Sequence, residues 1–235
     1  MQFAPLYPIA YRLLNPLFPE CLWHGDVLNP GQPPQIALTF DDGPHAHHTP
    51  QLLEILANYG VPASFFWLGV CVERAPGVAK AVYHQGHWIG LHGYTHREFV
   101  RLSASQLKAS LEKTQATIAH ACDLDLSLVQ HQMRDVRPPN GLFAPHTLTC
   151  LKQWGYRPVM WSVVPEDWVQ PGVAIVIQRI MRQIQNGSLL VLHDGYYGGA
   201  DVAETTSQLI PLLLQRGYQF VTIDQLWQSK RDKSI

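Results

Sequence analysis

Short apolar runs alternate with amphipathic segments from about residue 35 onward. Runs rich in β-branched and aromatic residues, bounded by glycine, proline or polar clusters, are typical of buried strands. They predict strands at residues 36–40, 63–68, 87–91, 157–162, 188–192 and 219–223. A more weakly marked strand is expected just before Arg137.

The segments between these runs carry the signals of helices. Ser103 and Gln106 form a capping-box pattern for a long helix that reaches about Cys122. Thr49 and Pro50 resemble an N-cap and a first helical residue. Residues 123–132 are expected to form a connection. Further helices are predicted after Thr49, through 78–83, at 147–154, at 173–185, at 202–215 and after 223.

Strands separated by crossover helices form a parallel sheet covered by helices. Seven or eight such units, without a GxGxxG motif after the first strand, favour a closed barrel over an open doubly wound sheet. We therefore predict an α/β fold, an irregular (β/α) barrel of the TIM-barrel type. The barrel domain is expected at residues 35–235, after an N-terminal strap at residues 1–34.

The strap is apolar, but it has no basic start, and prolines at positions 5, 8, 16 and 19 interrupt any continuous helix. These features argue against a secretory signal and against a membrane anchor. We expect the strap to pack on the barrel surface and the protein to be soluble, without a transmembrane segment. The sequence leaves localisation and oligomeric state open.

The composition argues against nucleic acid as a partner and points to a possible metal site. Of the 235 residues, 46% are hydrophobic and 15% are charged, and the formal net charge of −1 predicts no field that would attract nucleic acid. Twelve histidines are many for this length and make a metal site worth seeking. The cysteines at positions 21, 71, 122 and 150 include no CxxC pair, which favours buried free thiols.

Reactive side chains follow several of the predicted strands. Asp41 and Asp42 come directly after the first strand, where a turn at Gly43-Pro44 would let neighbouring side chains serve one site. Taken alone, DDGP reads as well as an Asx-turn before a helix. The later strands are followed by His92 and His96, by Arg137, by Asp167 and Trp168, and by His193 and Asp194. Because the loops after barrel strands share one face, these residues are expected to meet there.

The HxxxH pair suggests a metal site. Two imidazoles four residues apart, together with one carboxylate from Asp42, make a two-histidine, one-carboxylate set with open positions. An isolated HxxxH would more often be two ordinary loop histidines. This set suits one divalent ion, with zinc favoured and cobalt, nickel or iron compatible with the ligand types. His45, His47 and His48 are expected to serve the start of the following helix instead.

These motifs resemble those of the polysaccharide deacetylases, carbohydrate esterase family 4. The resemblance rests on TFDDGP, the HxxxH pair, RPPNG at 137–141, WSVVPEDW at 161–168 and LLVLHD at 189–194. It implies Asp41 as general base, with Arg137 orienting it, and His193 as general acid, tuned by Asp167. It also implies Asp42, His92 and His96 as metal ligands. The substrate is expected to contact Trp168, Val191 and Pro139, the first two around the acetyl methyl.

The resemblance implies a metal-dependent hydrolase that removes N-acetyl groups from N-acetylglucosamine-containing poly- or oligosaccharides such as chitin or peptidoglycan. Amide hydrolysis needs an activated water and a proton for the departing amine, and the implied roles supply both. One alternative is a metal hydrolase of another amide or of an O-acetyl ester. A second alternative is a non-catalytic carbohydrate-binding protein on the same fold.

The chain departs from the family pattern at four positions. Gly93 stands where serine or threonine is usual, and Val164 replaces the first aspartate of a DxxDW motif. Asn140 stands where an aromatic residue is common, and Val191 stands where leucine is usual. None of the four removes a residue that the chemistry needs, but Asn140 and Val191 are expected to alter the substrate groove and the acetyl pocket.

Overall fold

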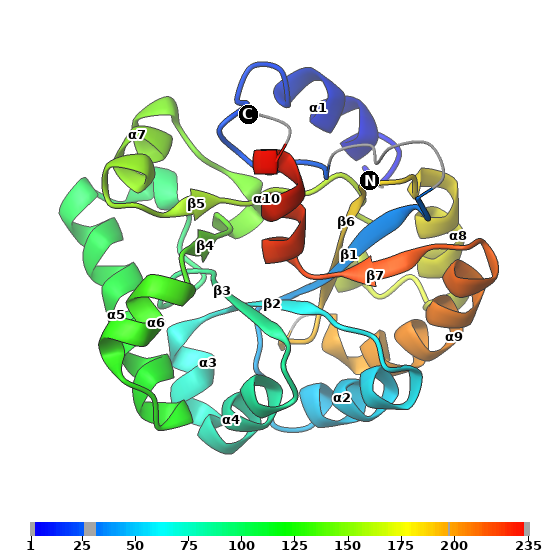
Figure 1. Cartoon of the computed structure of the whole chain (residues 1–235), viewed down its shortest axis with the longest axis horizontal. Helices are drawn as coiled ribbons and strands as arrows, with labels where there is room; N and C mark the ends of the chain where they lie inside the picture. The colour runs from blue at the N-terminus through cyan, green and yellow to red at the C-terminus, as the bar shows by residue number, and fades with distance from the viewer. Residues whose placement is uncertain (1–2, 26–31, 197, 233–235) are drawn as a thin grey trace.

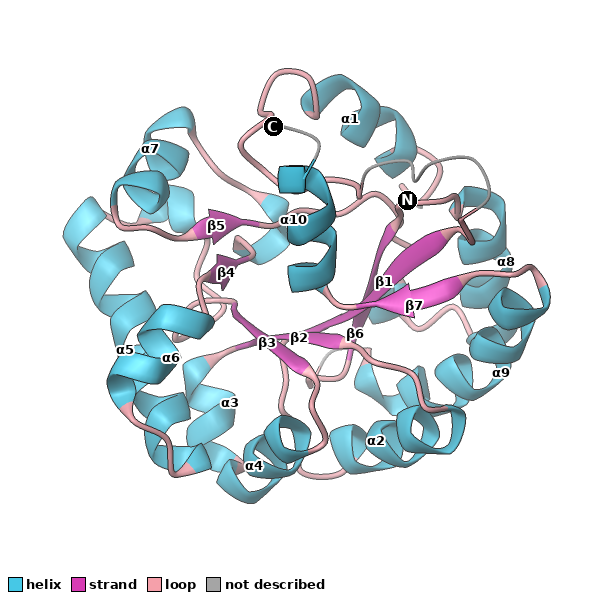
Figure 2. Ribbon diagram, in the orientation of Figure 1, coloured by secondary structure: helices cyan, strands magenta, loops and turns pink. Residues whose placement is uncertain are grey.

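The computed structural model describes residues 3–25, 32–196 and 198–232. In this part of the chain seven parallel strands curve into one sheet, and most of the helices surround it (Figures 1 and 2). The strand order is β5-β4-β3-β2-β1-β6, and β7 pairs with β1. The strands are β1 (Gln35–Asp41), β2 (Ser64–Trp67), β3 (Trp88–Leu91), β4 (Asp135–Val136), β5 (Arg157–Pro158), β6 (Leu189–His193) and β7 (Gln219–Val221).

The barrel is irregular between β5 and β6, because β4 and β5 have only two residues each. The chain after β5 closes this side, where Val163 forms a parallel bridge to Leu190 and the N–H groups of Ser162 and Val163 donate to the carbonyl of Leu189. The predicted barrel is confirmed. The predicted strand at 157–162 was too long, since most of it forms this irregular closing segment.

The side chains of β1 alternate between two environments, as in any strand. Leu38 and Phe40 belong to the large hydrophobic core cluster. Thr39 and Asp41 face the other way, where both accept hydrogen bonds from the buried Arg137. Because β1 pairs with β2 and β6 on either side, it holds this face at the centre of the sheet.

The N-terminal residues pack into the barrel wall. Helix α1 (Tyr7–Leu14) leads to Cys21 and Trp23, both fully buried, and Leu22 forms a parallel bridge with Val159. Tyr11 joins the same small hydrophobic cluster as Trp23. The predicted boundary at residue 34 stays a prediction, and residues 26–31 lie outside the described residues.

The predicted long helices are confirmed, with ends shifted by a few residues. The helices after α1 are α2 (His48–Tyr59), α3 (Gly69–Arg74), α4 (Pro76–His84), α5 (Ala104–Cys122), α6 (Leu126–Gln132), α7 (Pro145–Gln153), α8 (Val173–Gln183), α9 (Val202–Gln215) and α10 (Ile223–Asp232). The capping box of α5 forms as expected, with Ser103 accepting from the N–H of Gln106.

Two local predictions were wrong, and one short helix was missed. The connection at 123–132 contains α6, whose start is capped by the Asp125 carboxylate accepting from the N–H of Ser127 at 2.7 Å. The short helix α3, directly after β2, was not predicted. Thr49 is not an N-cap, because α2 already begins at His48 and the Thr49 hydroxyl donates to Asp194 at 2.5 Å.

All four cysteines are free thiols, as predicted. Three are buried and Cys71 is half-buried. Across the described ranges, no helix combines the length and the apolar character that crossing a bilayer requires.

Candidate active site

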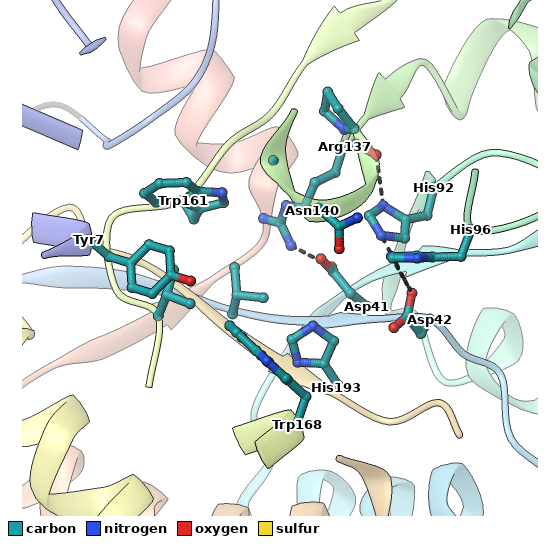
Figure 3. Close-up of a pocket in the computed structure, with 14 residues that line it drawn as sticks. Tyr7, Asp41, Asp42, His92, His96, Arg137, Asn140, Trp161, Trp168 and His193 are labelled. Atoms are coloured by element: carbon teal, nitrogen blue, oxygen red, sulfur yellow. Dashed lines mark hydrogen bonds and ion pairs between the residues drawn. The ribbon is translucent and has the colours of Figure 1, made fainter. Parts of the chain in front are cut away.

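Strand β1 ends in two carboxylates that face different partners. Asp41 is its last residue, and Asp42 follows with a φ of 70°, in the left-handed region. Both are buried. This backbone turn aims the neighbouring side chains at one cavity from different directions (Figure 3). Gly43 allows a close approach, since a Cβ there would collide with the carboxylate of Asp194.

Asp42, His92 and His96 form a cluster suited to a divalent metal. Their ligand-capable atoms all lie within 4.8 Å of one another. The Nε2 atoms of His92 and His96 are each 3.5 Å from Oδ1 of Asp42. This Oδ1 is buried and has no hydrogen-bond partner among the described residues. A buried, unpaired carboxylate oxygen facing two imidazole nitrogens fits a cation, so the residues present suit the group that the sequence predicts.

His92 is held in the form that a metal needs. Its Nδ1 lies 2.7 Å from the carbonyl oxygen of Arg137, which fixes Nδ1 as the donor and leaves the Nε2 lone pair facing Asp42. Burial lowers the pKa of His92, and this favours the neutral imidazole. Glycine at position 93, where the family pattern has serine or threonine, does not affect this orientation. The hydrogen-bond partner of His92 is the backbone carbonyl of Arg137, directly after β4.

Arg137 pairs with Asp41 inside the barrel. Its Nη1 donates to Oδ1 of Asp41 at 2.6 Å and to the hydroxyl of Thr39 at 2.8 Å, and its Nη2 donates to the carbonyl of Met160 at 2.9 Å. The guanidinium also lies over the ring of Phe66. Burial by itself would raise the pKa of Asp41, but Arg137, supported by His92 and His193, lowers it below the ordinary value. Asp41 is therefore an ionised carboxylate.

Asp167 fixes His193 with both of its oxygens. Oδ1 lies 2.8 Å from Nδ1 of His193, and Oδ2 accepts the backbone N–H of the same residue at 2.7 Å. Burial opposes the charged imidazolium, but Asp167, with Asp42 and Asp41, raises the pKa of His193 to about 9. His193 is the register partner of Asp41 in the β1–β6 pair, so an ionised carboxylate and a protonated imidazole lie side by side.

One cavity of about 380 Å³ brings these groups together (Figure 3). Of the predicted site residues, all but Asp167 and Pro139 line it, and Asp167 acts on it through His193. Pro139 is buried in a short turn, between lining residues Pro138 and Asn140. The remaining lining residues are Tyr7, Gly141, Trp161 and Val164.

Two residues that the structure brings to this region, Trp161 and Tyr7, had no predicted role in the site. Trp161 belongs to a quoted motif and follows β5, so its position could have been noticed. Tyr7 lies far from the other site residues in the sequence and belongs to none of the motifs that predicted the site. Asn140, which was expected to alter the substrate groove, lines the cavity; it adopts a φ of 58°, and its Nδ2 donates to the carboxylate of Glu98 at 3.4 Å.

Asp194, which was expected on this face of the barrel, is fully buried beside Asp41 and Asp42. Its Oδ2 accepts the Thr49 hydroxyl, while burial, with Asp42 adding to it, raises its pKa to about 7. His45 has the helix-start role that was expected, since its Nδ1 accepts the N–H groups of His47 and His48 at 3.2 Å.

Comparison with known proteins places this geometry in a family. A model of the polysaccharide deacetylases matches residues 29–159. The chain belongs to the polysaccharide deacetylase family. It is 34% identical over 197 residues to the peptidoglycan-N-acetylglucosamine deacetylase of Bacillus cereus, covering 83% of this chain and 89% of that one. It is 31% identical over 222 residues to a chitooligosaccharide deacetylase of Bradyrhizobium, covering 90% of this chain and 97% of the relative.

Solved structures agree with this family fold. PdaA of Bacillus subtilis, a family 4 carbohydrate esterase, superposes with a TM-score of 0.81 at 28% identity, covering 93% of this chain and 90% of that one. A family 4 pseudoenzyme of Bacillus anthracis superposes with a TM-score of 0.74 at 27% identity, covering 84% of this chain and 66% of that one. Since this polysaccharide deacetylase fold occurs in a pseudoenzyme, activity must be argued from the site itself.

Proposed function

We propose that this chain is a zinc-dependent hydrolase that removes N-acetyl groups from oligosaccharides or polysaccharides containing N-acetylglucosamine. The observation that carries the proposal is the pairing of opposite protonation states in one cavity: Asp41, held ionised by Arg137, beside His193, held protonated by Asp167. Both lie next to the Asp42, His92 and His96 cluster. The names of the similar peptidoglycan and chitooligosaccharide deacetylases support the choice of substrate.

Asp42, His92 and His96 would hold the ion. A divalent ion in such a site supplies Lewis-acid chemistry, polarising a carbonyl and lowering the pKa of water. Asp42 brings the one negative charge of the set. Two imidazoles and a single carboxylate suit zinc better than calcium or magnesium, which take mainly oxygen ligands.

Asp41 would act as the general base. Its carboxylate is ionised, and Arg137 donates to Oδ1, while Oδ2 accepts no hydrogen bond from the described residues. A water that attacks the acetyl carbonyl passes its proton to this carboxylate, and Arg137 then keeps Asp41 in position for the next cycle.

His193 would act as the general acid. Breaking the C–N bond leaves an amine nitrogen that must gain a proton, and the imidazolium supplies it from Nε2, because Asp167 occupies Nδ1. With a pKa of about 9, His193 carries that proton at neutral pH. Trp168 packs edge-on against the imidazole at 5.1 Å between ring centres and limits its movement.

Deacetylation assays test the proposal directly. Purified, metal-loaded protein is incubated with chitin oligomers, peptidoglycan fragments and acetylated xylan, and released acetate and free amines are measured separately. We expect acetate together with free amines from the first two substrates. Acetate from xylan alone would favour an O-acetyl esterase, and no release from any substrate would favour a non-catalytic binding protein.

Chelation is expected to abolish activity reversibly. The purified protein should carry about one divalent ion per chain, lose activity to a strong chelator and regain it on addition of zinc or cobalt. Elemental analysis and activity are measured on the same samples. Protein that holds no ion, with activity unchanged by the chelator, would contradict the assignment of Asp42, His92 and His96.

Replacing Asp167 with asparagine is expected to move the alkaline limb of the pH profile. In the native site His193 loses its proton near pH 9, so kcat/KM should fall above that pH. The variant keeps the size of the side chain but removes the charge that raises this pKa, while burial still lowers it. The alkaline limb should therefore move down by about 1–3 pH units. An unmoved limb would show that it reports another group.

A further inference from the structure

The cavity has an apolar end that extends beyond Trp168 and Val191, the two residues expected around the acetyl methyl. Figure 3 shows Tyr7 and Trp161 at the end away from His96 and Asp42. Tyr7 packs against Trp161 and Trp168 there, and the other uncharged apolar side chains that line the cavity are Val164 and Val191. Val164 stands where the family pattern has an aspartate, so this lining position carries no charge.

Three aromatic rings give this end its shape. The ring of Tyr7 packs edge-to-face against Trp161, with 5.2 Å between ring centres and an interplanar angle of 89°. It also packs edge-to-face against Trp168, at 6.5 Å and 82°. Edge-to-face packing favours a defined orientation. Tyr7 therefore bridges two tryptophans from the segment after β5, the first and the last residue of the WSVVPEDW motif.

The N-terminal residues hold Tyr7 firmly in place. The N–H of Phe3 donates to the carboxylate of Glu166 at 2.9 Å, and Ala4 is 1% exposed. One turn after Tyr7, Tyr11 is buried and stacks on His24. Burial, with Glu166 adding to it, raises the pKa of the Tyr7 phenol. Tyr7 thus presents a neutral ring to the cavity at any working pH.

We propose that Tyr7 forms the end wall of a pocket for the acyl group of the substrate. The pocket accepts N-acyl groups longer than acetyl, and the Tyr7 ring limits their length. The inference rests on the proposed function, which places the carbonyl beside Asp41 and His193. An acyl chain pointing away from the metal cluster then runs past Val191 and Trp168 toward Tyr7. The cavity of about 380 Å³ is lined both by the reacting groups and by Tyr7, so the apolar end is continuous with the place of the carbonyl.

The reaction itself does not change with chain length. Water forms the new C–O bond, the amide C–N bond breaks, the amine takes one proton, and the products are a carboxylic acid and an amino sugar. Only the apolar contact differs, and each enclosed methylene should improve binding roughly fourfold. An acyl chain long enough to collide with the Tyr7 ring gains no further affinity, because it must bend or displace the ring.

The test uses metal-loaded full-length protein and glucosamine oligomers carrying acetyl, propionyl, butyryl or hexanoyl groups. Amine release gives kcat/KM, and calorimetry gives the affinity of each oligomer under the same conditions. We expect propionyl and butyryl substrates to be bound at least as well as acetyl, and hexanoyl to be disfavoured. In Tyr7→Ala, the ratio of hexanoyl to acetyl efficiency should rise on the order of tenfold, the value of two further methylenes.

Three further variants separate the ring from its helix. Tyr7→Phe keeps the wall and should preserve the native chain-length profile. Tyr7→Leu keeps an apolar side chain on α1 and should shift the profile in the same direction as alanine, which guards against a poorly folded alanine variant. Ile9→Ala changes an exposed side chain on the same helix and should change nothing. Thermal midpoints are measured for all four.

Several outcomes overturn the inference. A native enzyme restricted to acetyl, an equal loss at every chain length in Tyr7→Ala and Tyr7→Leu, or a shifted profile in Tyr7→Phe would each do so. The proposed function fails separately, if no N-acyl oligomer is hydrolysed by metal-loaded native protein. In that case, chain-length-dependent binding that Tyr7→Ala alters would still support the acyl pocket, and binding that is indifferent to chain length would overturn it.

Discussion

Asp41→Asn is expected to lower kcat by roughly 10²–10⁴-fold while the protein keeps its metal, the range typical of lost general base catalysis. Asparagine has nearly the same shape, and its amide oxygen can still accept the Nη1 hydrogen bond of Arg137. The amide cannot take a proton from water. The variant should therefore fold, bind an ion and bind substrate, with the loss confined to turnover.

The neighbouring aspartate is the matched control. Asp42→Asn should lose metal affinity, because Asp42 brings the one carboxylate that faces the Nε2 atoms of His92 and His96. Titration with zinc, followed by calorimetry, measures this affinity independently of activity. Excess metal should partly restore Asp42→Asn but leave Asp41→Asn inactive. The division of roles fails if both variants keep metal and activity alike, or if both lose metal alike.

The contrast between these two residues shows what local sequence can reveal. Asp41 and Asp42 follow an apolar strand, and parallel strands bring their carboxyl ends to one face. From this rule, the meeting of Asp42 with His92 and His96 was predictable, as was that of Asp41 with Arg137. The rule depends only on where strands end, and strand ends are marked by a change from apolar to reactive residues.

Other parts of the site depend on contacts that no local pattern records. Tyr7 reaches the cavity because α1 packs beside the loops after β5, more than 150 residues further along the chain. The barrel closes through single bridges such as Val163 to Leu190, since β4 and β5 are too short to form a regular seam. Pro139 sits in a predicted motif, yet the turn that contains it buries its ring and leaves Asn140 at the cavity.

His193→Ala is expected to slow hydrolysis of an N-acetyl sugar by roughly 10²–10⁴-fold, with the metal still bound. An amine is a poor leaving group unless it gains a proton, and His193, with a pKa of about 9, carries one at neutral pH. The Asp42, His92 and His96 cluster does not depend on the imidazole. Asp167 also keeps a partner in this variant, because its Oδ2 accepts the backbone N–H of residue 193.

The choice of substrate separates proton donation from positioning. An activated acetate ester, such as nitrophenyl acetate, releases a stable anion that needs no proton. The loss in His193→Ala should therefore be much smaller on the ester than on the N-acetyl sugar, when kcat is compared for the same metal-loaded preparations. His47→Ala, which removes an exposed imidazole near the start of α2, is the control and should change neither rate. Equal losses on both substrates would show that His193 positions the acyl group, and the proton donor would then have to be another residue of this cavity.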